Sequence, residues 1–104
     1  MDETSYHILA DAALADWYDR LDAAFEAGSL EDLELTGGVL SIHTASGKTY
    51  ILSKHTASRQ LWLASPVSGG LHFAFNTDWR TADGKILSTL LRDELAAENI
   101  EVAA

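Results

Sequence analysis

Residues 59–65 read Arg-Gln-Leu-Trp-Leu-Ala-Ser, a stretch in which two leucines alternate with other side chains. Successive side chains of a strand point to opposite faces, so Leu61 and Leu63 would face a core while Gln60 and Trp62 face away. The stretch therefore predicts a half-buried strand in a sheet with one open face. A tryptophan on an open face is typical of a protein-partner anchor. The alternative is a tryptophan that a loop covers.

Further strands are predicted on both sides of this stretch. Residues 30–44 indicate a hairpin, because residues 39–44 alternate in hydropathy and a Thr-Gly-Gly turn precedes them. Residues 49–54 are β-branched and aromatic, which favours a third strand. Residues 71–76 predict a fifth strand, and residues 79–80 begin a short sixth one. The predicted turns are residues 45–48, 65–70 and 83–84.

Helices are predicted at both ends of the chain. Residues 3–27 have apolar side chains at three- and four-residue steps, with Thr4 or Ser5 as the N-cap and Gly28 after the last turn. The members of this apolar stripe are Tyr6, Leu9, Ala13, Trp17, Leu21 and Ala24. Residues 86–98 repeat the spacing, and Asn99 would cap them. The second stripe consists of Leu87, Leu90, Leu91 and Leu95.

The order helix, meander, helix indicates the fold class. Two helices with one apolar stripe each have to cover the same face of one sheet. We therefore expect an α+β fold, a two-layer α/β sandwich with both helices on one face of an antiparallel sheet of five to six strands. A length of 104 residues is enough for one domain, so residues 1–104 are expected to form a single one.

The charge is distributed unevenly along the chain. It has 16 acidic and 7 basic residues and a net charge of −9. Residues 1–34 hold ten acids and one base, whereas residues 35–104 are neutral overall. Such a field repels phosphate backbones, so nucleic acid is excluded as a partner. Cations and basic protein surfaces remain as partners.

Several site classes and compartments are excluded by what the sequence lacks. Without cysteine the chain has no disulfide, thiolate zinc site or cysteine-ligated iron–sulfur cluster of its own. It has no phosphate-binding glycine motif and no nucleophile motif, so we expect no enzyme. No apolar run is long enough to span a membrane, and residues 1–11 lack the basic start of a signal peptide. We expect a cytoplasmic protein with no membrane partner.

One face of the predicted N-terminal helix carries carboxylates. Asp11, Asp19, Asp22 and Glu26 fall within roughly 80° on a helical wheel, and His7 lies one turn before Asp11. Carboxylate oxygens favour hard cations, and an imidazole shifts the preference towards Fe(II) or Co(II). His7 and Asp11 are four residues apart and can reach one metal ion. Because the ligands follow a surface, weak binding is expected. The alternative is an acidic face that only solvates the domain.

The ordered set of motifs resembles the frataxin family, most closely its bacterial CyaY type. The resemblance covers nearly the whole chain. Its motifs are Tyr6-His7-Ile8-Leu9-Ala10-Asp11, Gly37-Gly38-Val39-Leu40, Gln60-Leu61-Trp62-Leu63-Ala64-Ser65-Pro66, Ser68-Gly69-Gly70-Leu71-His72-Phe73, Trp79, Asp83-Gly84 and Leu90-Leu91. One departure is that residues 53–57 read Ser-Lys-His-Thr-Ala, where the family tends to have Asn-x-Gln-x-Pro.

The resemblance implies two helices on an antiparallel sheet, weak binding of Fe(II) and Fe(III), and no organic cofactor. It also implies that the protein docks on the cysteine desulfurase and the scaffold of iron–sulfur cluster assembly and regulates that machinery. The implied metal ligands are His7, Asp11, Asp19, Asp22, Glu26, Glu31, Asp32 and Glu34. The implied partner-binding residues are Gln60, Trp62 and His72.

Two other functions stay open at this point. The chain could be an acidic adaptor with no metal role, or an iron store with ferroxidase activity. A store would need iron-dependent oligomers, whereas the other two hypotheses are compatible with the expected monomer.

Overall fold

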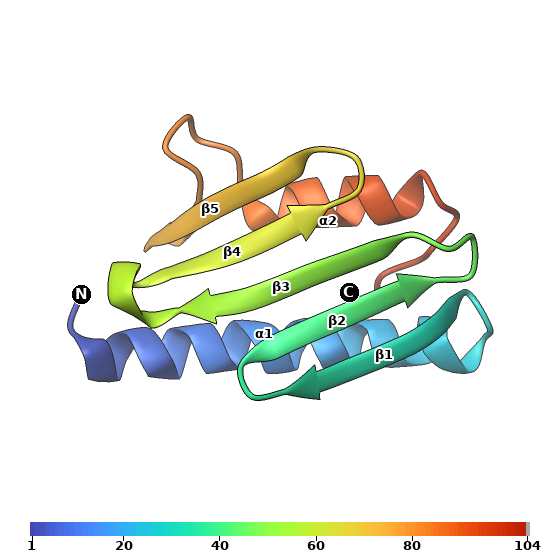
Figure 1. Ribbon diagram of the computed structural model, residues 1–104, viewed down its shortest axis with the longest axis horizontal. Helices are drawn as coiled ribbons and strands as arrows, with labels where there is room; N and C mark the ends of the chain where they lie inside the picture. The colour runs from blue at the N-terminus through green and yellow to red at the C-terminus, as the bar shows by residue number, and fades with distance from the viewer. Residues whose placement is uncertain (104) are drawn as a thin grey trace.

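The computed structural model describes residues 1–103 and consists of two helices behind one sheet (Figure 1). The elements in chain order are α1 (Glu3–Glu26), β1 (Leu30–Thr36), β2 (Val39–Thr44), β3 (Thr49–His55), the short 3₁₀ helix η1 (Thr56–Ser58), β4 (Gln60–Ser65), β5 (Gly69–Asn76), β6 (Asp78–Arg80) and α2 (Leu87–Ala96). The strands are antiparallel neighbours in the order β1-β2-β3-β4-β5-β6. Both helices cover the same face of the sheet (Figure 1), so the predicted two-layer fold is confirmed. No helix among residues 1–103 is long and apolar enough to cross a bilayer.

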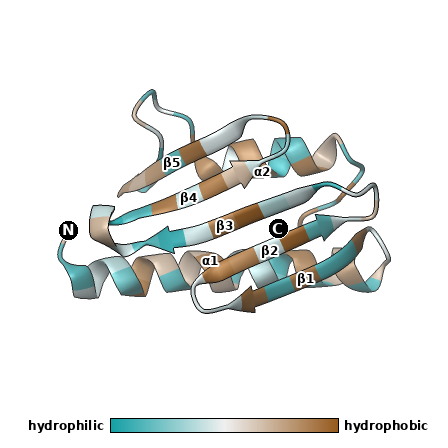
Figure 2. Ribbon diagram, in the orientation of Figure 1, coloured by the Kyte–Doolittle hydropathy of each residue, from teal (hydrophilic) through white to brown (hydrophobic). Residues whose placement is uncertain are grey.

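The hydrophobic core lies between the helices and the inner face of the sheet. Hydrophobic and hydrophilic segments follow each other along the strands and α1 (Figure 2), as expected for elements that bury one side. The strands contribute the buried hydrophobic side chains Leu30, Leu33, Leu40, Ile42, Tyr50, Leu52, Leu61, Leu63, Phe73 and Trp79. On α2 the buried residues are Leu87, Leu91 and Leu95, whereas Leu90 is half-buried.

The buried stripe of α1 differs in part from the prediction. Tyr6, Trp17, Leu21 and Ala24 are buried as expected, and Ala10 and Leu14 are buried as well, whereas Leu9 and Ala13 pack against the core at half-buried positions. The apolar stripe is therefore wider than predicted.

The caps of α1 differ from the prediction only at the start. The N-cap is Asp2 rather than Thr4 or Ser5, because its Oδ1 accepts the Ser5 amide at 2.7 Å. Gly28 follows the last turn with a φ of +87°, as predicted.

The predicted turn over residues 65–70 is shorter than expected. The Ser65 hydroxyl accepts the amides of Val67 and Ser68 at 3.0 Å, which closes the turn within three residues. Gly69 and Gly70 then belong to β5 and pair with Ser65 and Ala64 of β4. Strand β5 is consequently two residues longer than the sequence predicted.

Candidate functional site

Six exposed carboxylates lie on two adjacent elements, the C-terminal half of α1 and the edge strand β1. We call this set the acidic ridge, and it consists of Asp19, Asp22, Glu26, Glu31, Asp32 and Glu34. Leu33 is buried towards α1, so Asp32 and Glu34 project from the opposite face of the strand, where they pair with His43 and Ser41 of β2. Glu31 lies at a bulge of β1. The structure therefore brings the six residues to one edge of the molecule without making them converge.

The ridge is a dispersed surface rather than a preformed coordination site. Among residues 1–103, no three His, Asp or Glu side chains are grouped closely enough to hold a metal ion. Any cation there would bind to few protein ligands at a time and keep part of its water shell. The donor set, which consists of carboxylates, still fits a hard cation such as Fe(III) or a weakly held Fe(II).

The electrostatics of the ridge are unfavourable for the protein alone. Within the part of the chain that the structure describes, none of the six carboxylates forms an ion pair. Asp22 and Glu26 lie near the C-terminus of α1, where the helix dipole is negative. The last turn has no basic residue that would offset this repulsion. A bound cation or a basic protein surface would relieve both repulsions.

His7 and Asp11, the other two predicted ligands, lie outside the acidic ridge. Oδ1 of Asp11 lies 2.8 Å from Nζ of Lys54, which joins α1 to β3. His7 is half-buried, and its ring centroid is 5.3 Å from that of Tyr6. The carboxylate of Asp11 is thus already compensated by a cation of the protein. No local pattern predicts this pair, since its members are 43 residues apart.

The open face of the sheet carries an aromatic stack across three strands. The indole of Trp62 on β4 lies between two imidazoles, those of His55 on β3 and His72 on β5. The ring centroids are 3.6 Å apart for His55 and Trp62 and 4.1 Å apart for Trp62 and His72, with interplanar angles of 7° and 9°. Trp62 does project from the open face, as predicted, but the two histidines cover both faces of its indole. The indole is consequently half-buried.

Hydrogen bonds hold the stack in place. Nε1 of Trp62 donates to Oε1 of Gln60 at 2.8 Å, and the Ser58 hydroxyl donates to the same oxygen at 3.0 Å. Nδ1 of His55 lies 2.6 Å from the Ser58 oxygen. The structure therefore brings the predicted partner residues Gln60, Trp62 and His72 together. It adds His55, whose diagonal position relative to Trp62 follows from the pairing of His55 with Gln60.

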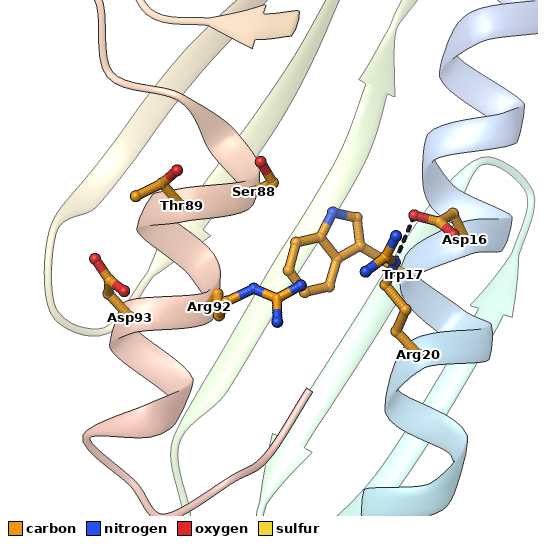
Figure 3. Close-up of a pocket in the computed structure, with 7 residues that line it drawn as sticks. All are labelled: Asp16, Trp17, Arg20, Ser88, Thr89, Arg92 and Asp93. Atoms are coloured by element: carbon orange, nitrogen blue, oxygen red, sulfur yellow. Dashed lines mark hydrogen bonds and ion pairs between the residues drawn. The ribbon is translucent and has the colours of Figure 1, made fainter. Parts of the chain in front are cut away.

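The surface has hollows beside the stack and between the two helices. A groove of about 560 Å³ beside the stack is lined by Gln60, His72, Asn76, Arg80 and neighbouring residues. A smaller pocket of about 280 Å³ lies between the helices (Figure 3), and it is lined by Asp16, Trp17, Arg20, Ser88, Thr89, Arg92 and Asp93. Asp16 binds Arg20 within it at 2.8 Å. The pocket contains none of the predicted site residues.

Comparison with known proteins identifies the family and agrees with the fold. Residues 1–100 match the model of a family described as the frataxin-like domain. The chain belongs to the frataxin family. Among frataxins, it is 37% identical over 97 residues to the iron–sulfur cluster assembly protein CyaY of Vibrio cholerae, with 90% of this chain and 88% of that protein covered. It is 33% identical over 100 residues to the mitochondrial frataxin of Dictyostelium discoideum, where 90% of this chain spans only 52% of the relative.

Solved frataxin structures share the fold. The frataxin of Psychromonas ingrahamii superposes with a TM-score of 0.83 over 99% of this chain and 96% of its own, at 19% identity. Trimeric yeast frataxin from Saccharomyces cerevisiae, described as complexed with ferrous, gives a TM-score of 0.76 at 31% identity, over 94% of this chain and 86% of its own. The first of these supports the fold alone, and the second supports membership of the family as well.

Proposed function

We propose that this frataxin is an iron-binding regulator of iron–sulfur cluster assembly, which binds Fe(II) or Fe(III) weakly on the acidic ridge. The observation that carries the proposal is that all six ridge carboxylates are exposed and lack an ion pair among residues 1–103. A CyaY relative is named for iron–sulfur cluster assembly, and a yeast relative is described as complexed with ferrous. Both descriptions agree with a metal-binding role in that process.

The geometry of the ridge supports weak and reversible iron binding. Oxygen ligands that lie along a surface bind a cation with few contacts and little discrimination between metals. In this proposal iron is cargo or signal rather than a resident cofactor, and the chain is no enzyme. Oxidation of bound Fe(II) by oxygen would give at most a weak ferroxidase activity.

The ridge is also proposed to dock on a basic surface of the cysteine desulfurase, while the Trp62 side of the open face contacts the scaffold in the same complex. Because the ridge charges are exposed, their attraction to a basic partner would raise the association rate and weaken with salt. A repulsive surface on the isolated protein thereby becomes an attractive one in the complex.

Charge reversal tests the docking. The double variant Asp19→Lys/Asp22→Lys should bind the desulfurase at least about tenfold more weakly at low salt. The variant Glu3→Lys/Glu101→Lys makes the same change in net charge at exposed positions outside the ridge, and it should retain most of the binding. Equal binding of the wild type and the ridge variant at low salt would contradict docking through the ridge.

An adaptor without a metal role is the second candidate, and one observation favours it. Residues 1–103 contain no group of side chains arranged to hold a metal ion. An electrostatic docking face would not need such a group. The adaptor would respond to Fe(II) no more than to Mg(II) at the same ionic strength. An anaerobic Fe(II) titration with Mg(II) as the control separates the two.

A further inference from the structure

The two edges of the sheet differ in how they are protected from other chains. The edge strand β1 carries Glu31, Asp32 and Glu34 and has a bulge, and both charges and bulges discourage pairing with a further strand. At the opposite edge, β5 reads Gly-Gly-Leu-His-Phe-Ala-Phe-Asn and contains no Asp, Glu, Lys, Arg or Pro. Strand β5 therefore lacks the features that protect β1.

One side of β5 is left open over part of its length. Strand β4 pairs with β5 from Gly69 to Ala74, whereas β6 covers the other side only from Ala74 to Asn76. Among residues 1–103, residues 69–73 pair with no strand except β4. The backbone groups on this open side are consequently available for an antiparallel strand from another chain.

A hollow of about 320 Å³ lies on α2 at the same end of the molecule. It faces away from α1, because Ser88 and Arg92 line the pocket between the helices and do not line this hollow. Helix α2 is held against the start of β5, since Glu94 accepts a hydrogen bond from Ser68 at 2.7 Å. The residues that line the hollow are Lys85, Ile86, Thr89, Leu90, Asp93 and Glu94.

The surface between the hollow and the open side of β5 is apolar. Ile86 and Leu90 of α2 are half-buried. Leu71, in the middle of the open stretch, is also half-buried and pairs with the buried Leu63, so both leucines point to the helix side of the sheet. A strand added to β5 would place its own inward side chains on this apolar surface and remove it from water.

The hollow carries opposite charges on its two sides. Lys85 and Asp93 lie four positions before and after Thr89, so they flank it in the lining. Lys85 has only an exposed ion pair, with Asp83 at 3.7 Å, and Asp93 has none among residues 1–103. A two-fold axis at Thr89 would bring Lys85 of each copy to Asp93 of the other. The charges of the hollow are thus complementary to themselves.

We propose that the open side of β5 and the hollow on α2 bind a second copy of this chain, in a two-fold dimer whose β5 strands pair antiparallel about Leu71. The pairing would join two sheets into one, with both α2 helices antiparallel on the same face. The acidic ridges would lie at the two far ends, because they follow the β1 edge, so repulsion between chains of net charge −9 stays low. The dimer needs no metal and goes beyond the proposed function.

Sedimentation equilibrium of the metal-free protein, with a chelator present, tests the proposal. The contact is small, so we expect a dissociation constant on the order of 0.1 mM and a mass that rises towards twice that of the monomer. Thr89→Glu places two carboxylates against each other at the axis and should weaken the dimer at least about tenfold. Thr4→Glu makes the same change at an exposed position in the first turn of α1 and should leave the dimer intact.

An exchange of charges distinguishes the two-fold contact from general repulsion. Lys85→Glu and Asp93→Lys each set like charges against each other and should weaken the dimer, although the second makes the chain less negative. The double variant Lys85→Glu/Asp93→Lys restores the pair with its signs reversed and should recover most of the wild-type association. Hydrogen exchange should show protection within residues 69–73 that increases with protein concentration.

Three results would overturn this inference and leave the proposed function intact. The first is a monomer mass at all concentrations up to about 1 mM. The second is a dimer that Thr89→Glu does not weaken or that the double variant does not recover, because the copies would then meet elsewhere. The third is protection of residues 69–73 that appears only with the complex of desulfurase and scaffold, which would assign the open side to a strand of a partner. Circular dichroism of the variants checks that they are folded.

Discussion

Nζ of Lys54 lies 2.8 Å from Oδ1 of Asp11, so a strand cation neutralises the first carboxylate of the helix face. The Lys54 side chain is only 16% exposed, whereas that of Asp11 is 62% exposed. Lys54 also lies over the ring of Tyr6, with Nζ 6.0 Å from the ring centroid. Asp11 therefore has a structural partner that the ridge carboxylates lack.

This pair predicts that Asp11 contributes little to iron binding. The variant Asp11→Asn should lower the free energy of unfolding by at most about 1 kcal/mol, because one partner of the pair is largely exposed. Its response to Fe(II) at Asp22 and Glu26 should match that of the wild type. Urea unfolding and an iron titration measure the two effects. Loss of the iron response in Asp11→Asn would show that Asp11 is a ligand despite its pairing.

The end of α1 predicts a gain in stability when a ridge carboxylate is removed. Glu26 lies in the last turn, where no base offsets the negative end of the dipole. Glu26→Gln should raise the free energy of unfolding by about 0.3–1 kcal/mol at low salt, and less at high salt. Glu3→Gln is the matched control at the other end of the helix, where a carboxylate is favourable, and it should lower stability. A destabilised Glu26→Gln variant would contradict this account of the ridge.

The open face predicts a separation of the two surfaces. Trp62→Ala should leave iron binding unchanged, because the stack is distant from the ridge along the order of strands. It should reduce the effect of the protein on the rate of cluster formation in a reconstituted assembly reaction. Val67→Ala, which removes an exposed apolar side chain in the neighbouring turn, serves as the control. If Trp62→Ala weakens iron binding instead, the two surfaces are not independent.

The buried hydroxyl of Tyr50 predicts how stability depends on alkaline pH. Burial, with Glu94 nearby, raises the pKa of Tyr50 from 10.0 to about 12. The unfolded chain then loses this proton before the folded chain does. Stability should therefore be complete below about pH 10 and fall as the pH rises towards 12, by about 1.4 kcal/mol per unit of pKa difference.

Tyr50→Phe tests this dependence. The Tyr50 hydroxyl has no hydrogen-bond partner among residues 1–103, so its removal should leave stability at neutral pH unchanged or raise it by up to about 1 kcal/mol. The alkaline loss should become shallower, as urea unfolding at neutral and alkaline pH would show. Tyr18→Phe, at a half-buried position, should keep the wild-type dependence. An unchanged alkaline loss in Tyr50→Phe would contradict the assignment to this residue.

The architecture could be predicted because it depends on local patterns. The alternation around Leu61 and Leu63 and the helical stripe containing Trp17 and Leu21 report which side of each element is buried. Packing two such stripes on one sheet leaves few arrangements. The pattern predicts a turn at the two glycines of β5 because glycine is common in turns, whereas the Ser65 hydroxyl already closes the turn at Val67 and Ser68 and leaves both glycines to pair with β4.

The site could be predicted only as a set of residue types. Charge counts identified the acidic face, yet the compensation of Asp11 by Lys54 depends on a contact between distant residues. The position of Trp62 followed from alternation, whereas its enclosure by His55 depends on strand register between β3 and β4. Register depends on turn geometry as well as on the hydrophobic pattern, and no turn is predicted at the η1 connection between these strands.

An anaerobic Fe(II) titration of isotope-labelled protein, followed by NMR, tests the central claim most directly. Mg(II) at the same ionic strength is the control for screening. The account predicts paramagnetic broadening confined to the acidic ridge, strongest near Asp22 and Glu26 and weak at Asp11, with no equivalent change in Mg(II). The absence of any Fe(II)-specific response up to millimolar concentration would contradict iron binding on the ridge and favour the adaptor.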